Sequence, residues 1–243
     1  MSTVPIIGFD RRLELRWLEQ AASLALLGTP STEIRRLLAD MLASEAADPA
    51  QGREGREKTL RLLMRIWVTP REEVARLRQE GLSHLRRLPS EQHLPLHWGM
   101  TSAAYPFFAH VTAAAGRLLS LQDTVGAAQV QRRLQEQLGD RQFVSRPARH
   151  ALRTLVGWDL LAETGEKGLY RTGVGHKVDE DVAGWLVEII LQGGPPRPLQ
   201  SLSRDPALFP FAIPPLQATR LAGRAGLRTF RQGLDEDVIA SAG

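Results

Sequence analysis

The chain has 243 residues, 43% of them hydrophobic and 24% charged, so it has the composition of a folded protein with a sizeable core. Basic residues exceed acidic ones by 31 to 27, and the three lysines, Lys58, Lys167 and Lys177, leave 28 arginines. The sequence contains no cysteine, which excludes disulfides, thiolate catalysis and cysteine-ligated zinc.

The arginine excess and the apolar segments bear on partners and location. The guanidinium fork suits phosphates and guanine edges, although the codon preference of a GC-rich genome explains the excess equally well. The first residues, MSTVPIIGFDRR, do not resemble a signal peptide, and the apolar stretches 21–28 and 182–194 are too short to cross a bilayer. We therefore expect a cytoplasmic protein with no membrane partner.

The first part of the chain predicts four helices from the helical spacing of its apolar residues, beginning with residues 10–27. Ser31 or Thr32 is expected to cap the second helix, and Thr69 is expected to cap the fourth. The polar stretch 44–55 separates the second helix from the third. This pattern predicts a helical N-terminal domain over residues 1–92.

Residues 93–108, HLPLHWGMTSAAYPFF, are apolar and interrupted by Pro95 and Pro106. Because proline is disfavoured inside a helix, this stretch is expected to be a hinge or a packed connector into the next module. A further helix is predicted over residues 107–122.

The next segments change in character. A short helix is predicted over 125–139, and the turn DRQFV leads into a helix from Ser145, its expected cap, to about Trp158. Residues 160–173 hold two short apolar runs around TGEKG, which is the signal of a β-hairpin. The order helix, helix, turn, helix, hairpin is that of a winged helix-turn-helix, predicted over residues 93–175.

The helix SRPARHALR has two chemically different sides. Its apolar residues are spaced at i, i+4 and i+7 and are expected to face the core: Ala148, Leu152 and Leu155. A second set shares another side and is basic: Arg146, Arg149, His150 and Arg153. No acid occurs between Arg141 and Trp158. A helix that enters the major groove needs this arrangement of a buried anchor and outward donors.

Other basic residues extend the predicted DNA contact. Arg132 and Arg133 precede the basic helix, Lys167 lies in the expected tip of the hairpin, and Arg171 follows on its second strand. These four residues are expected to hold phosphates, with Ser145 at the start of the basic helix. Two alternatives remain open, because winged helices also dock proteins and basic helix faces are often merely solvated.

The third helix carries a basic face of its own. Lys58, Arg61 and Arg65 are spaced at i, i+3 and i+7, so a second DNA-contacting surface is possible there. An ordinary amphipathic helix explains the pattern as well, since Glu54 and Glu57 dilute the charge.

Residues 176–243 are expected to form a mixed C-terminal extension. A helix over 179–191 is predicted with Asp179 as its cap, followed by a linker rich in proline and glycine. A packed loop with a short helix comes next, and GLRTFRQGLDEDVIA is expected to form a final pair of strands. The predicted fold class is therefore mainly α, with small β elements.

The order of features from about residue 8 to 175 resembles a known family. A helical N-terminal half leads through REKTLRLLMRIWV and TPREE into the aromatic YPFF and then the predicted winged helix. This order of elements is similar to that of BrxA, the small helical DNA-binding accessory protein of BREX phage-defence systems. The resemblance implies a non-enzymatic DNA-binding role in a multi-gene defence island, with other defence proteins as further partners.

The residues typical of catalysis do not converge. The six histidines are His84, His93, His97, His110, His150 and His176. His93 and His97 have the spacing of two metal ligands, but Pro95 is expected to break the helix between them, and no third ligand is near in sequence. TGVGHK lacks the P-loop pattern, and no Gly-x-Ser-x-Gly elbow occurs. We therefore expect no enzyme activity, no metal and no cofactor.

These observations favour a protein that binds double-stranded DNA. Two other functions are compatible with the sequence. The first is a subunit whose winged helix docks a partner protein, and the second is a transcriptional regulator with an effector pocket or dimer surface near PPLQATRLAGRAGLRTF.

Overall fold

The computed structural model describes residues 8–45, 52–138, 144–232 and 236–242, and it is mainly helical. Its α-helices are α1 (Leu15–Leu26), α2 (Ser31–Ser44), α3 (Arg53–Leu63), α4 (Glu72–Arg87), α5 (Leu94–Ala104), α6 (Pro106–Leu119), α7 (Ala127–Leu138), α8 (Ser145–Gly157), α9 (Glu180–Leu191), α10 (Leu199–Leu202) and α11 (Ala218–Ala222). One π-helical turn and two 3-10 turns accompany them: η1 (Met64–Val68), η2 (Ser90–Gln92) and η3 (Pro206–Leu208).

The strands are short and form three small sheets. They are β1 (Thr124–Gly126), β2 (Leu161–Glu163), β3 (Leu169–Thr172), β4 (His176–Lys177), β5 (Arg197–Pro198), β6 (Phe211–Ala212), β7 (Leu227–Gln232) and β8 (Glu236–Ser241). The first sheet is antiparallel in the order β1-β3-β2, the second pairs β4 with β6 in parallel, and the third is antiparallel in the order β5-β8-β7. The expected hairpin at 160–173 and the expected pair of strands near the C-terminus are thus confirmed, whereas β1 was not predicted.

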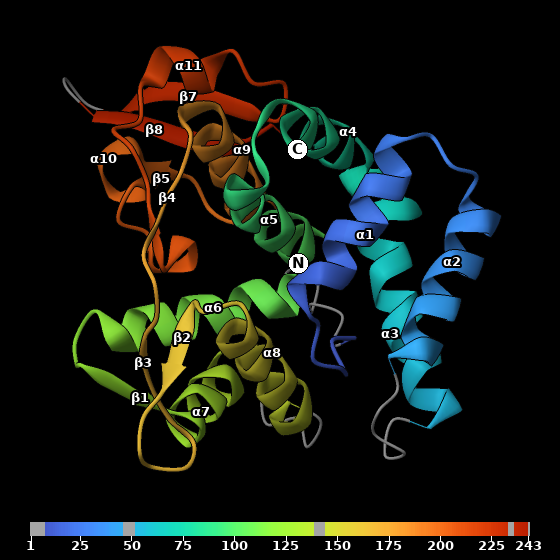
Figure 1. The fold of residues 1–243 in the computed structure, drawn as a ribbon. Coiled ribbons are helices and arrows are strands. Elements are labelled where there is room, and N and C mark those ends of the chain that lie inside the picture. The colour runs from blue at the N-terminus through green and yellow to red at the C-terminus, as the bar shows by residue number, and fades with distance from the viewer. Residues whose placement is uncertain (1–7, 46–51, 139–143, 233–235, 243) are drawn as a thin grey trace.

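Three groups of elements surround α5 (Figure 1). Helices α1 to α4 lie on one side, α6 to α8 with the β1-β3-β2 sheet lie at one end, and α9 to α11 with β7 and β8 lie at the other. Helix α5 contacts α1, α4, α6 and α9, and every one of its residues is buried. The buried residues form one continuous cluster from Phe9 to Ile239, so the three predicted parts of the chain share a core.

The stretch expected to be a connector is thus the central helix of the fold. Pro95 lies in the first turn of α5 and Pro106 is the first residue of α6, positions at which proline costs no helical hydrogen bond. Gly99 lets the helix lie close to α9, because a Cβ at this position would be 2.7 Å from Cη2 of Trp185. The indole Nε1 of Trp185 in turn donates to the carbonyl of Leu77 on α4 at 3.1 Å.

The predicted helix caps are partly right. The Asp179 carboxylate accepts from the backbone N–H groups of residues 181 and 182, which confirms it as the cap of α9. The Thr69 prediction is wrong, because its hydroxyl turns back to the Met64 carbonyl across η1 and α4 begins only at Glu72. Ser145 is also not a cap, since the residue before it already has helical backbone angles.

The second helix likewise has no capping side chain. Pro30 occupies its N-cap position, and Ser31 and Thr32 lie inside the helix. The expected turn DRQFV is residues 140–144, and all of it except Val144 lies outside the described part of the chain.

Candidate nucleic-acid interface

Helix α8 is anchored by the side predicted to be buried. Ala148, Leu152 and Leu155 are fully inaccessible to solvent, and α8 packs on α6, α7 and β2. The opposite side presents Arg146, Arg149 and Arg153 to solvent, with His150 half-buried beside them. None of these three arginines forms an ion pair with any residue in the described ranges. The helix therefore presents three exposed guanidinium groups that form no ion pair in the described part of the chain, and the charge of Arg146 acts on Glu54 of α3.

The segment that precedes α1 is bonded to α8 over a long sequence distance. The Leu13 backbone N–H donates to Thr154 Oγ1 at 3.0 Å, and Trp158 Nε1 donates to the Leu13 carbonyl at 3.1 Å. The Trp158 ring also lies 5.7 Å from the ring of Phe108 on α6. Trp158 thus joins the end of α8 to the N-terminal segment and to α6.

This attachment brings two further arginines to α8 that the sequence analysis missed. Arg12 lies against Gly157 at the end of the helix, where its Nη2 is 3.0 Å from the position of an added Cβ. The charge of Arg11 acts on His150 together with that of Arg146. Their contribution depends on contacts such as Leu13 with Thr154, 141 residues apart, so no local pattern could reveal it.

The surroundings of His150 favour the neutral form of its imidazole. Burial lowers the pKa of its imidazole, and the neighbouring charges of Arg11, Arg146 and Arg153 lower it further, while Asp10 opposes them. A phosphate bound near His150 would raise the pKa of its imidazole and favour the protonated ring.

The β2–β3 hairpin lies next to the basic side of α8. Burial and the charge of Glu163 raise the pKa of Tyr170 on β3, while the charges of Arg149 and Arg153 act in the opposite direction. These two arginines are therefore close to the hairpin. Lys167 in its turn and Arg171 on β3 are both exposed, so the hairpin adds two exposed bases near α8.

The two arginines of α7 differ in their surroundings. Both Arg132 and Arg133 are exposed, but Arg133 Nη1 lies 3.2 Å from Oε2 of Glu136 one turn later. Arg132 has no such partner within the described ranges. Of the two predicted phosphate contacts on α7, Arg132 is the freer to bind an anion.

The basic face predicted on the third helix is present on α3 and η1. Arg61 is exposed, Arg65 is half-buried, and Lys58 forms an ion pair with Glu54. The Arg11 guanidinium lies 3.7 Å from the position that a Cβ of Gly55 would take on α3. The same arginine acts on His150 of α8, so it connects the basic faces of α3 and α8.

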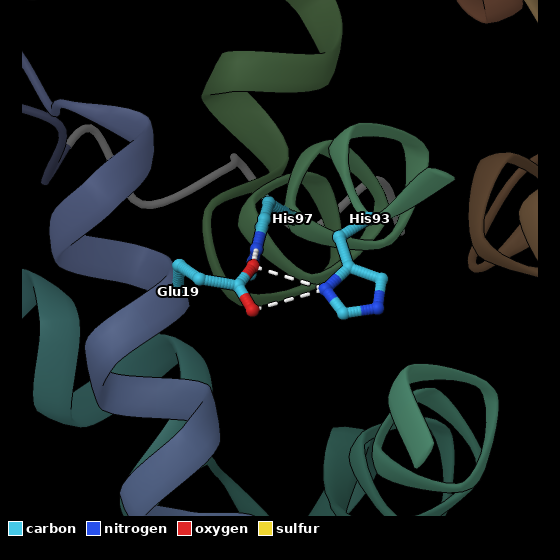
Figure 2. A group of neighbouring side chains, drawn as sticks. All are labelled: Glu19, His93 and His97. Atoms are coloured by element: carbon cyan, nitrogen blue, oxygen red, sulfur yellow. Dashed lines mark hydrogen bonds and ion pairs between the residues drawn. The ribbon is translucent and has the colours of Figure 1, made fainter. Parts of the chain in front are cut away.

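A second cluster of chemically active side chains lies in the core beside α5 (Figure 2). His93 Nδ1 lies 3.0 and 3.1 Å from the two carboxylate oxygens of Glu19 on α1, and His97 Nε2 lies 2.7 Å from Oε2. These three groups satisfy the distance condition for a shared metal ion. The expectation that Pro95 keeps the two histidines apart is wrong, because the helix runs past it, and Glu19 supplies the third group from 74 residues away.

Hydrogen bonds connect the members of this cluster to one another and to Trp67 and Leu88. Trp67 Nε1 donates to His97 Nδ1 at 3.0 Å, so the neutral His97 ring carries its proton on Nε2 and donates it to Glu19. His93 Nε2 lies 2.9 Å from the Leu88 carbonyl, so both of its ring nitrogens face oxygen atoms. Burial raises the pKa of Glu19, but the hydrogen bonds from His97 and His93 outweigh this and lower it to about 2.

A metal at this site would have to displace those hydrogen bonds. A ligating histidine donates the N–H of its other ring nitrogen to an acceptor, whereas the other nitrogen of His97 faces the Trp67 N–H, which can only donate. The cluster therefore fits a role in joining α1 to α5 better than a role in holding a metal.

The C-terminal region contains a small hollow near the segment considered for an effector. It has a volume of about 180 Å³ and is lined by residues of α9 and α11 and by 214–217. Pockets for drug-sized ligands span about 300–1,000 Å³, so this hollow would accommodate only a smaller molecule.

Comparisons of the chain with protein-family models, with curated proteins and with solved structures found no match. Within the described ranges, the helices include none with the length and apolar character needed to span a membrane. The functional assignment therefore depends on the arrangement of side chains described above.

Proposed function

We propose that this chain is a non-enzymatic protein that binds double-stranded DNA through a winged helix-turn-helix formed by α6, α7, α8 and the β2–β3 hairpin. The observation that carries the proposal is the two-sided character of α8. Its apolar side is fully buried, while Arg146, Arg149 and Arg153 face solvent and form no ion pair in the described part of the chain. Solvent-facing donors on a rigid helix are what base edges and phosphates require.

In this proposal the basic residues have distinct roles. Arg146, Arg149, His150 and Arg153 enter the major groove, with Ser145 in the first turn beside the backbone. Phosphates on either side are held by Arg132, Arg133, Lys167 and Arg171. Arg11 and the α3 bases Lys58, Arg61 and Arg65 extend the contact to flanking phosphates, because Arg11 bridges the two faces.

The cellular role follows the family resemblance. A BrxA-like protein would act in the cytoplasm as an accessory component of a BREX-type phage-defence system, with DNA and other defence proteins as its partners. The helical N-terminal half and the order of elements from α1 to β3 are compatible with this role.

Fluorescence anisotropy with a labelled duplex of random sequence, titrated at several salt concentrations, tests the proposal. We expect micromolar or tighter binding that weakens steeply with salt. Replacing Arg149 and Arg153 with alanine removes two phosphate or base contacts, so the slope of log K against log salt should fall by about 1.8 if both contact phosphate.

The matched control replaces Arg228 and Arg231 with alanine. Both are exposed on β7, at the far end of the molecule from α8 (Figure 1). This variant changes the net charge by the same amount and should bind as the parent does. Equal binding by the α8 variant and the parent across the salt series would refute the assignment of α8, and absence of binding at low salt would favour a protein-docking role.

A further inference from the structure

A hollow of about 510 Å³ opens between α2, α3, η1 and the segments around residues 8–10 and 69–71. Its lining contains five basic side chains: Arg35, Lys58, Arg61, Arg65 and Arg71. Asp10 is the one acid among its lining residues, and Leu62, Met64 and Tyr105 supply apolar surface. The volume is in the range of pockets that bind small ligands.

Three of these bases lack an acidic partner. Arg35 pairs with Glu57 and Lys58 pairs with Glu54, but Arg61, Arg65 and Arg71 form no ion pair within the described ranges. The Nε of Arg65 is buried and has no hydrogen-bond acceptor among the described residues. A buried donor without an acceptor is costly and needs an explanation, and an anion in the hollow would supply the missing acceptor.

Tyr105 places a neutral donor in the same wall. Burial and the charge of Asp10 raise the pKa of its phenol, and the charges of Arg71 and Arg61 oppose this rise. The hydroxyl therefore stays protonated near these two guanidinium groups. A ligand with several negatively charged oxygens could accept from the arginines and the phenol together, whereas a cation would meet their repulsion.

We propose that this hollow binds a phosphate group, held by Arg61, Arg65 and Arg71 and by the Tyr105 hydroxyl. The planar guanidinium fork matches phosphate oxygens, and three of them can neutralise the charge of a phosphate or a pyrophosphate. No residue of α8 lines the hollow, so its phosphate belongs either to a free phosphorylated compound or to the backbone of bound DNA.

Calorimetric titration of the full chain with sodium pyrophosphate, at constant ionic strength, tests this proposal. We expect saturable binding to the parent and at least tenfold weaker binding to the double variant Arg61→Gln/Arg65→Gln. The matched control Arg228→Gln/Arg231→Gln removes the same charge from β7 and should bind pyrophosphate as the parent does. Because Arg65 is partly buried, a second variant, Arg61→Gln/Arg71→Gln, repeats the test with circular dichroism as a check on folding.

A labelled duplex then distinguishes the two sources of phosphate. If pyrophosphate competes with the duplex and the pocket variants have a smaller salt slope, the pocket holds a DNA phosphate. If pyrophosphate binds without changing DNA affinity, the pocket holds a free phosphorylated compound. Absence of pyrophosphate binding to the parent, or equal binding to the parent and to folded pocket variants, overturns the proposal, whatever α8 does with DNA.

Discussion

The indole N–H of Trp67 donates to Nδ1 of His97 at 3.0 Å, and this bond fixes the protonation of the ring that faces Glu19. Because the indole can only donate, the neutral His97 carries its proton on Nε2, the nitrogen that a metal would need. Burial of His97 also lowers the pKa of its ring, which keeps it neutral. Trp67 on η1, which belongs to neither helix, thus determines which nitrogen of His97 on α5 donates to Glu19 on α1.

The first prediction is that Zn²⁺ does not bind the cluster of Glu19, His93 and His97 tightly. An equimolar addition of Zn²⁺ should leave the thermal unfolding midpoint of the parent unchanged, because coordination would leave the Trp67 N–H facing a protonated nitrogen. Differential scanning fluorimetry with and without EDTA measures this. An upward shift that EDTA reverses and that Glu19→Gln abolishes would show that the cluster is a metal site.

The second prediction concerns acid stability. The pKa of Glu19 is about 2 in the folded chain against its usual 4.5, so its contribution is present above pH 4.5 and is lost as the pH falls from 4.5 towards 2. The full shift corresponds to about 3 kcal/mol, which solvent screening of the partly exposed carboxylate reduces to about 1–2 kcal/mol. Burial also lowers the pKa of His97 below its usual 6.5. The folding stability that this neutral ring allows is therefore lost progressively as the pH falls below 6.5.

Urea denaturation at pH 7.5, 5.5 and 3.5 checks this dependence. In Glu19→Gln the stability at neutral pH should fall, and the further loss between pH 5.5 and 3.5 should be smaller than in the parent. A variant with the same loss as the parent over that interval would show that other carboxylates account for the acid sensitivity.

The third prediction is that Gly99→Ala destabilises the fold strongly. The added Cβ would lie 2.7 Å from Cη2 of Trp185 and 2.9 Å from Cδ2 of Leu186, and neither side chain can move freely in the core. Overpacking of this kind costs about 1–3 kcal/mol, or more where the backbone must shift. Gly175→Ala is the control, since its Cβ would meet no atom within 4 Å. Equal urea midpoints for the two variants would contradict the packing of α5 on α9.

Local patterns predicted the amphipathic elements well. The apolar spacing in SRPARHALR correctly assigned Ala148, Leu152 and Leu155 to the core, and TGEKG correctly marked a hairpin. Helix α5 escaped prediction because it is buried on all sides, so it has no polar face to generate a period, and its prolines look like breaks.

Contacts between distant segments could not be predicted. Neither the meeting of Glu19 with His93 and His97 nor the attachment of Leu13 to Thr154 has a sequence signal, because each depends on how α1 packs in the folded chain. The positions of Arg11 and Arg12 beside α8 therefore could not be recognised from the sequence.

The fourth prediction tests the attachment of the N-terminal segment to α8. Thr154→Val keeps the shape of the side chain but leaves the buried Leu13 N–H without its acceptor, which costs about 1–3 kcal/mol. Thr112→Val is the matched control, because among the described residues its hydroxyl bonds only to the Phe108 carbonyl within its own helix. Urea denaturation should show a larger loss for Thr154→Val. Similar losses in the two variants would mean that the Leu13 bond contributes little.

The fifth prediction is that DNA binding strengthens as the pH falls from 7.5 to 5.5. Burial and the charges of Arg11, Arg146 and Arg153 lower the pKa of His150 in the free chain, and a bound phosphate would raise it, so binding takes up a proton. One proton changes the affinity by at most about tenfold per pH unit. Anisotropy titrations at constant ionic strength measure this dependence, which should be flatter in His150→Gln.

A histidine away from α8 serves as the control for the pH dependence of His150→Gln. His176→Gln on β4 should keep the pH dependence of the parent, because that ring lies near Phe211 and not on the basic side of α8. If His150→Gln retained the full dependence while His176→Gln lost it, proton uptake would occur outside the α8 surface. His150 would then not contact the DNA, and the groove-binding set would reduce to the three arginines of α8.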